Sequence, residues 1–599
     1  MTWKSNLVTT QMTEHTPTVI LRSERSEAVA ESRVRLMANP GLATSRGIHI
    51  PGWRAAAFWV AAVLVPFAFL GMFFLAPVAN LLARGLGGGF EAMSRILTSV
   101  RTATLLRNTL LQTVFGTGLS VFLGVPIAYL LYRTRFPGRG ALQALVMIPF
   151  VLPTVVVGVA FRSLLRTGGL LASWNLDQTF TAVLLGLVFF NISVVVRTVG
   201  SLWERLDPRQ EQAARSLGAG PIRTFVTVTL PALAPAIAAA AALVSLFCIT
   251  AFGVVLVLGG ARYGTIETEI YQRTTVFLDL SGAAVLSIVQ LLVIAAVLWF
   301  SNWATNRHDA ALALTGGRYS VARWQSRNIL DVIAALTCAI AVIGLIAFPL
   351  FGLIVRSLQD GAGNWTLANY RNLGTTGALI SPTTALFNSL RTGAIAAAIS
   401  LAIGLLLALV LSRRPRSNYA KRSINLFDAL VMLPLGVSSV TVGFGFLITF
   451  VRPIFGIDLR TNGLLIPVAQ AVVAVPLVVR TLLPVLRAID PRMQQAAAAL
   501  GASPLQVLRT IDLSLAGRAI GLAAGFAFAT SLGEFGATSF LARPDAPTLP
   551  VLIFRLLSRP GQENYGMALA ASVLLGLLTA AIMLAFEHFR GVSEFGNSR

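Results

Sequence analysis

The segment Leu206–Pro231, LDPRQEQAARSLGAGPIRTFVTVTLP, returns 283 positions later as Ile489–Ser514, IDPRMQQAAAALGASPLQVLRTIDLS. Both copies are polar and rich in alanine, and both lie between long apolar segments. An Asp-Pro pair near the start of each copy predicts a helix start, because Asp is a favoured N-cap and Pro fits the first helical position. Gly218 and Gly501 predict the helix ends, and a proline three residues later prevents continuation. Each copy should therefore form a short helix, a sharp turn and a second helical stretch.

The composition is that of a polytopic membrane protein. Of 599 residues, 55% are hydrophobic and only 12% are charged, with a mean hydropathy of +0.76; soluble domains carry about 25% charged residues. The net charge of +23 does not indicate a nucleic-acid partner, because the basic residues lie mostly in short loops beside apolar segments. That placement is the signal of membrane topology, so the expected surroundings are lipid.

Apolar segments long enough to span a bilayer, which takes about 20 residues, follow one another along the chain. They lie near 55–82, 108–131, 141–164, 180–200, 230–258 and 283–303, and again near 328–357, 386–412, 424–451, 463–486, 515–540 and 565–588. The predicted fold is an all-α integral membrane protein of about twelve transmembrane helices in two six-helix repeats. The expected parts are a disordered cytoplasmic tail (1–54), a first half (55–305, with the loop 201–231), a cytoplasmic connector (306–327), a second half (328–590, with the loop 484–514) and a cytoplasmic tail (591–599).

The two halves repeat beyond the loop. Matching pairs include Asn108 and Asn388, Gly124 and Gly404, and the dipeptides Phe252-Gly253 and Phe535-Gly536. Because six spans is an even number, both halves should insert with the same orientation, as parallel repeats with a pathway between them. The basic loops, which include both repeated loops, place those loops and both termini in the cytoplasm.

The repeated loop resembles the cytoplasmic "EAA" loop of binding-protein-dependent ABC importer permeases, in which Glu-Ala-Ala is followed after three residues by Gly. The matching positions and their preceding neighbours are Glu211, Gln212, Ala213, Ala214 and Gly218 in the first copy, and Gln494, Gln495, Ala496, Ala497 and Gly501 in the second. The chain departs from the pattern at Gln212 and Gln495, where the family often has Glu. The resemblance implies that each loop docks on an ATPase subunit and transmits its movement.

The fused two-half organisation resembles the thiamine and ferric-iron permeases of ABC importers over about residues 55–590. Four short segments resemble the thiamine branch: Arg135–Arg139, Val188–Asn191, Thr265–Tyr271 and Thr548–Pro550. The resemblance implies a type I importer fold in the bacterial inner membrane, two copies of an ABC ATPase subunit, a periplasmic or lipid-anchored binding protein and alternating access. Thiamine or ferric iron is the expected substrate; sulfate, molybdate and polyamine permeases share the loop and are the alternatives.

No catalytic or cofactor motif is evident in the chain. A P-loop needs Gly-x4-Gly-Lys-Ser/Thr, and neither Lys4 nor Lys421 has that context. ATP and Mg²⁺ are therefore expected on partner subunits, and no cofactor, metal site or catalytic residue is expected here. An ion-coupled secondary transporter is the alternative from another class, but it would need relay residues at mid-membrane, and few are present. An integral-membrane enzyme is disfavoured because His, Cys and Asp do not cluster.

Acidic residues near the spans are candidates for the substrate path, because an ionisable group at the bilayer centre costs roughly 2.5–3.5 kcal/mol. Glu267, Glu269 and Glu534 are predicted in the outer half of the membrane, where they would suit a cationic substrate. The other reading is that they pair with nearby arginines or face outer water. Pro149 and Pro434 are predicted to break helices beside the path, since freed backbone groups are tolerated only where protein or a cavity satisfies them.

Overall fold

The computed structural model describes residues 52–260, 262–306, 322–323, 328–374, 380–413, 418–451, 453, 456, 458–460 and 463–591. Nearly all of the predicted connector and both predicted tails lie outside these residues. Within them the chain is almost entirely helical, apart from a two-residue parallel pair between β1 (Thr134–Arg135) and β2 (Ala322–Arg323).

The first half begins with one long helix in three parts, α2 (Gly52–Leu70), the π-helical turn η1 (Gly71–Leu75) and α3 (Ala76–Gly87). It continues with α4 (Gly89–Leu97), α5 (Val100–Arg133), α6 (Arg139–Val151), α7 (Thr154–Leu165), α8 (Phe180–Trp203), α9 (Pro208–Ser216), α10 (Pro221–Thr224), η3 (Phe225–Thr229), α11 (Leu230–Ile249), α12 (Gly253–Leu258), α13 (Ile266–Thr275) and α14 (Leu280–Asn306).

The second half repeats this order. It contains α15 (Ile329–Ala339), η5 (Ile340–Ala347), α16 (Phe348–Ser357), α17 (Ala368–Arg371), α18 (Pro382–Leu411), α19 (Asn418–Met432), η7 (Leu433–Gly436), α20 (Ser439–Thr449), α21 (Leu465–Ala488), α22 (Pro491–Ala499), α23 (Pro504–Val507), η8 (Leu508–Asp512), α24 (Leu513–Leu532), α25 (Gly536–Leu541), α26 (Leu549–Leu557) and α27 (Gln562–Gly591).

The prediction of about twelve spans is confirmed, but not all of them are straight. Ten helices in the described residues are long and apolar enough to cross a membrane, and twelve spans result if each of two bent pairs counts as one. The pairs bend by 103° between α6 and α7 and by 96° between η7 and α20. The residues between them, Leu152 and Val437, have extended backbone, and Leu152 precedes a proline, which disfavours helical backbone.

Two other predicted spans, 230–258 and 515–540, were wrong as single helices. The first is interrupted between α11 and α12, and the second between α24 and α25. The first interruption, Thr250-Ala251-Phe252, carries no charge, so hydropathy gives no sign of it, whereas the second, Gly533-Glu534-Phe535, contains an acidic residue. The break places Phe252 and Phe535 between helices.

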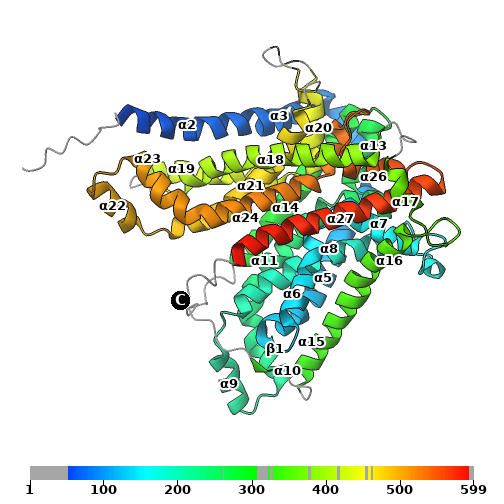
Figure 1. The fold of residues 1–599 in the computed structure, drawn as a ribbon, viewed down its shortest axis with the longest axis horizontal. Helices are drawn as coiled ribbons and strands as arrows, with labels where there is room; N and C mark the ends of the chain where they lie inside the picture. Colours follow the sequence, from blue (N-terminus) through cyan, green and yellow to red (C-terminus); the bar gives the residue numbers. More distant parts are fainter. Residues whose placement is uncertain are drawn as a thin grey trace, which may run out of the picture.

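The molecule has two arms that meet at one end and diverge toward the other (Figure 1). One arm carries α21, α24 and, at its tip, α22; the other carries α5, α8, α11 and, at its tip, α9. The short helices of the two repeated loops therefore lie at the separate tips, which we call the tip end. Helices α7, α13, α16 and α26 lie where the arms meet, which we call the joined end.

The first helix of each half packs against the other half. Helices α2 and α3 lie along α18 and α20 of the second half, whereas α15 and α16 pack on α5 and α7 of the first. Figure 1 shows this exchange, with α2 on the arm that ends at α22 and α15 on the arm that ends at α9. The two arms are thus not the two sequence halves.

Glycines allow the central helices of each arm to approach closely. A Cβ on Gly124 of α5 would lie 2.7 Å from Val195 Cβ of α8, and one on Gly404 of α18 would lie 2.5 Å from Val478 Cγ1 of α21. The two contacts are equivalent in the two halves. Small residues at such crossings are the main means by which membrane helices pack tightly.

We expect Gly124→Ala and Gly404→Ala each to destabilise the protein by about 1–3 kcal/mol, the usual cost of overpacking. The measurement is the apparent Tm in detergent. Gly118→Ala is the matched control in α5, because nothing lies within 4 Å of a Cβ added there. An equal Tm for Gly118→Ala and Gly124→Ala would contradict the close approach.

Candidate coupling helices and the interface between the halves

Both repeated loops form the predicted short helix and turn. The Asp207 side chain accepts a hydrogen bond from the Arg209 backbone N–H at 2.9 Å, and Asp490 accepts one from Arg492 at 2.9 Å. Gly218 and Gly501 both have φ of +86°, in the left-handed region, which glycine enters without steric cost. In each loop the next N–H bonds back to the helix, from Ala219 to Ala214 O at 3.1 Å and from Ala502 to Ala497 O at 3.0 Å, as in a Schellman ending.

The two short helices are surface elements with the same exposure pattern. No residue of α9 or α22 is buried. The predicted coupling residues divide alike in both copies: Gln212, Ala213, Gly218, Gln495, Ala496 and Gly501 are exposed, and Glu211, Ala214, Gln494 and Ala497 are half-buried.

An apolar residue missed by sequence reasoning stands out at each tip. Leu217 is 88% exposed and Leu500 is 91% exposed, each directly before the turn glycine. Single exposed leucines are common on protein surfaces, but here the same exposed residue recurs at equivalent positions of two separate arms. The signal available in the sequence was the identical Leu-Gly pair in both copies.

In the first half, Arg133 holds the short helix against the end of α5. Its Nη2 lies 3.3 Å from Glu211 Oε2, and its Nη1 donates to Leu206 O at 3.4 Å. The other Glu211 oxygen accepts from the Thr229 hydroxyl at 3.0 Å. Glu211 thereby connects α5, α9 and the start of the following span.

In the second half, Arg413 has the same role with a different acid. Arg413 Nη2 lies 3.0 Å from Asp512 Oδ2, and Gln494 Nε2 donates to Asp512 Oδ1 at 2.6 Å. Arg413 also lies over the Trp59 ring of α2, 4.6 Å from its centroid. Asp512 is 4% exposed at its side chain, so this link is more buried than that of Glu211, at 22%.

The two arrangements are equivalent by position but exchange the carboxylate. Arg133 and Arg413 are 280 positions apart, like the matching Asn108 and Asn388. Glu211 corresponds to Gln494, and Thr229 corresponds to Asp512, at the 283-residue spacing of the loops. The carboxylate lies on the short helix in the first half and on the following span in the second half. The arginine and the contact among three elements are present in both halves. The acidic contact that the second loop lacks at Gln494 and Gln495 is therefore supplied by Asp512.

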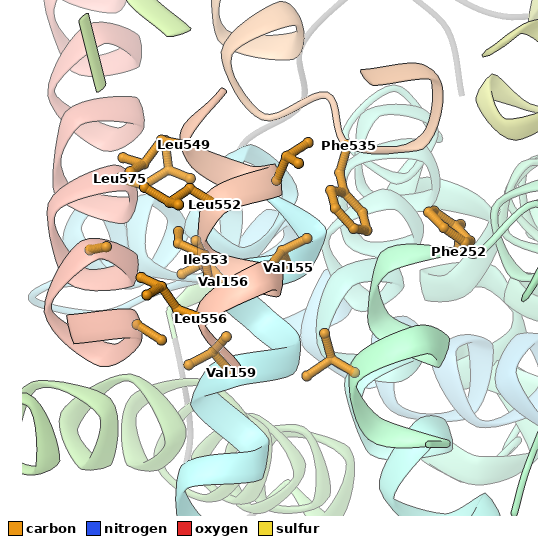
Figure 2. Close-up of a cluster of buried hydrophobic side chains, with 14 of the residues drawn as sticks. Val155, Val156, Val159, Phe252, Phe535, Leu549, Leu552, Ile553, Leu556 and Leu575 are labelled. Atoms are coloured by element: carbon orange, nitrogen blue, oxygen red, sulfur yellow. The ribbon is translucent and has the colours of Figure 1, made fainter. Parts of the chain in front are cut away.

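Equivalent phenylalanines meet where the halves join. The rings of Phe252 and Phe535 stack with centroids 5.3 Å apart and planes inclined by 17°. A residue can contact its own equivalent only near the axis that relates the repeats, so this pair marks that axis. Figure 2 shows both rings beside a buried apolar cluster from α7, α26 and α27. Tyr271 packs on Phe252 at 5.3 Å, and Phe554 packs on Phe535 at 5.6 Å.

The bent spans reach the same interface through the residues after their breaks. A Cβ on Gly253 would lie 2.5 Å from Thr154 Oγ1 at the start of α7, and one on Gly536 would clash with Ser439 at the start of α20. Pro149 and Pro434 themselves are buried shortly before these breaks.

The three predicted acids have different surroundings. Glu269 pairs with Arg101 at 2.8 Å and with Arg273 at 3.2 Å, and Arg273 also binds Asp279 at 2.9 Å. Glu534 lies in the break before α25 and accepts from the backbone N–H groups of Ala537 at 2.8 Å and Thr538 at 3.0 Å, and from the Thr538 hydroxyl. These contacts occupy both acids with structural partners.

Glu267 is the exception. It is 0% exposed, and one oxygen accepts from Gln290 Nε2 at 2.9 Å. The other oxygen, Oε2, has no hydrogen-bond partner among the residues that the structure describes. The structure therefore does not join the three acids into one site.

Comparison with known proteins agrees with this organisation. Residues 116–313 match the family model described as "Binding-protein-dependent transport system inner membrane component". The thiamine transport system permease protein ThiP of Brucella abortus (strain 2308) is 29% identical over 537 residues, which cover 86% of this chain and 93% of that protein. The same-named protein of Escherichia coli (strain K12) is 27% identical and covers 90% and 98%.

A third relative matches less than half of the chain. The probable sulfate transport system permease protein cysT of Nephroselmis olivacea is 31% identical over 260 residues, covering 42% of this chain and 90% of that protein. The repeated halves, the exposed short helices and these relatives define a membrane-spanning permease subunit of an ABC importer. The chain belongs to the family of binding-protein-dependent transport system inner membrane components.

Proposed function

We propose that this chain is the permease of a thiamine importer in the bacterial inner membrane. The proposal of thiamine as the substrate rests on how much of this chain each relative matches. The thiamine permeases match across both halves, 86% and 90% of this chain, whereas the sulfate permease matches 42%. The thiamine permeases thus share with this chain the fused architecture of two halves.

Each short helix docks one copy of an ABC ATPase subunit, on which ATP and Mg²⁺ bind. The exposed Leu217 and Leu500, with the alanines and glutamines beside them, supply the docking surfaces. This assignment puts the tip end and both termini in the cytoplasm and the joined end outside. The permease itself hydrolyses no ATP in this scheme.

The arrangement of the arms supports alternating access. The tips are apart and the joined end is closed by Phe252 and Phe535 (Figures 1 and 2), as an inward-facing state requires. Closure of two ATPase subunits on ATP draws α9 and α22 together and separates the halves at the aromatic contact. The driving force is the unequal affinity of the ATPase pair for the two arrangements, because a ligand shifts only equilibria that it binds unequally.

A recess lies directly outside the aromatic contact and suits substrate delivery. Its volume is about 310 Å³, and its lining includes Phe535, Tyr271, Phe554 and Arg555. An extracytoplasmic binding protein docked at the joined end would release its substrate here.

The test is to co-express the chain with candidate ATPase subunits, purify on this chain and measure vanadate-sensitive ATP hydrolysis in lipid vesicles. We expect stimulation by a thiamine-loaded binding protein. Binding proteins loaded with ferric iron, sulfate, molybdate or a polyamine are the comparisons, and stimulation by one of these alone would name a different substrate. If no ATPase co-purified with the chain, an ion-coupled secondary transporter would be favoured.

A further inference from the structure

Glu267 is an unusual acid in this protein. Basic residues outnumber acidic ones by 47 to 24, so partners for a carboxylate are abundant. Yet among the described residues no Arg, Lys or His forms a salt bridge with Glu267, although Glu269, two positions later, binds two arginines. A buried carboxylate without a cationic partner is costly, so a fold retains it at a cost to stability.

The surroundings of Glu267 offer acceptors in excess of donors. Gln290 of α14 uses one amide group for both Glu267 Oε1, at 2.9 Å, and Ile249 O, at 3.1 Å. Gln290 Oε1 and Glu267 Oε2 are both buried without a hydrogen-bond partner in the part of the chain that the structure describes. Two unpaired acceptor oxygens on neighbouring side chains, one of them a carboxylate, suit a positively charged group.

The position of Glu267 links it to the contact between the halves. Tyr271, one helical turn further along α13, packs on Phe252 at 5.3 Å. Helix α13 also packs against α20 of the second half, whose N-cap Ser438 lies against the Glu267 carboxylate but donates its hydroxyl hydrogen to Thr441 Oγ1 at 2.9 Å. Separation of the halves at Phe252 and Phe535 would therefore uncover Glu267.

The depth of the site fits a transport path. Gln290 lies about ten residues into α14, which corresponds to about 15 Å of helix rise, or half of a hydrocarbon core of about 30 Å. An ionisable residue at that depth is a functional candidate by default.

The pair of Glu267 and Gln290 has no counterpart at the equivalent positions of the second half. At the 283-residue spacing, Glu267 corresponds to Pro550 and Gln290 to Val573, neither of which carries a charge or an amide side chain. The two halves thus share the same helical scaffold, but only the first half carries the acid and the amide at these positions.

We propose that Glu267, oriented by Gln290, binds the positively charged group of the transported substrate when the Phe252–Phe535 contact opens. This assignment rests on the proposed import function and names its substrate class as a cation. Thiamine, whose thiazolium ring is permanently charged, is the probe.

The experiment uses the full complex in vesicles and compares the native chain with Glu267→Gln and Glu267→Asp. We expect thiamine uptake by Glu267→Gln to fall by at least about tenfold, since a buried charge contact is lost, with partial uptake in Glu267→Asp. Stimulation of ATP hydrolysis by the loaded binding protein should persist, because docking does not involve Glu267. The apparent Tm of Glu267→Gln should equal or exceed the native value, since an unpaired buried acid is removed. Glu563→Gln, an exposed acid at the joined end that accepts from Asn372 at 2.9 Å, is the control for charge.

Three outcomes would decide against the assignment. Uptake by Glu267→Gln within about twofold of the native rate, a difference of less than 1 kcal/mol, would show that the carboxylate does not bind substrate. A lower Tm in both variants together with lost uptake would show a structural role. If the native chain did not respond to the thiamine-loaded binding protein at all, the proposed import function would fall, and this assignment with it.

Discussion

Replacing Gly218 and Gly501 with proline is expected to abolish thiamine uptake and binding-protein-stimulated ATP hydrolysis while leaving membrane insertion intact. Both glycines have φ of +86°, whereas proline is fixed near −65°. Proline would also remove the N–H groups that donate to Arg215 O and Ala498 O, each at 3.0 Å. A loss of about 3 kcal/mol at each turn corresponds to roughly a hundredfold fall in the population of the correct turn.

The expected loss would come from backbone conformation and not from steric crowding by the new side chain. Nothing lies within 4 Å of a Cβ added at either glycine, so only backbone conformation opposes a side chain there. Asparagine tolerates the left-handed region better than other side chains, so Gly218→Asn and Gly501→Asn should keep most activity. Unimpaired uptake in both proline variants would remove the coupling role from these loops.

The second large effect is expected at Glu211, whose carboxylate is replaced in the second half by that of Asp512. Glu211→Gln should weaken the link between α5 and α9 by about 1.5–3 kcal/mol, the range for hydrogen bonds to charged groups, and lower stimulated ATP hydrolysis. Adding Thr229→Asp to this variant reproduces in the first half the Gln494 and Asp512 pair of the second. We expect the double variant to recover most of the lost coupling, because Arg133 regains a carboxylate.

A double-mutant cycle gives the measurement. The single variants Glu211→Gln and Thr229→Asp, the double variant and the native chain are compared for stimulated hydrolysis and apparent Tm. Thr229→Asp alone places two carboxylates beside one arginine, so it should also be impaired. We expect a favourable interaction energy of about 1–2 kcal/mol between the two substitutions, within the range for residues in one network. Additive effects would mean that the two positions do not share Arg133.

The sequence was sufficient for the repeat, the number of spans and the local shape of the coupling loops, because each depends on short-range signals. Asp-Pro starts, glycine ends and apolar runs of spanning length act within a few residues of where they occur. The bends after Pro149 and in the segment with Pro434 were predictable for the same reason. The break at Phe252 was not, since no charged residue marks it, and at Phe535 the charge of Glu534 predicts a functional candidate rather than a break.

Long-range partners account for what the sequence could not show. The acid that binds Arg413 is 99 residues away along the chain, and its equivalent in the first half is a threonine. Arg101, which pairs with Glu269 together with Arg273, is 168 residues away from Glu269 along the chain. Hydropathy predicts that a helix spans a membrane but not which neighbours it packs against, so the exchange of α2–α3 and α15–α16 between the halves had no sequence signal.

That exchange has a consequence for biosynthesis. Helices α2 and α3 leave the ribosome first, and α3 can pack on α14 of the same half, but their second-half partners α18 and α20 follow about 300 residues later. At 5–20 residues per second this delay is on the order of 15–60 s, during which α2 rests in the bilayer with lipid in place of α18. The amino-terminal half therefore cannot complete its tertiary structure before the carboxyl-terminal half is inserted, and a prematurely terminated chain would present this unpartnered helix to membrane proteases.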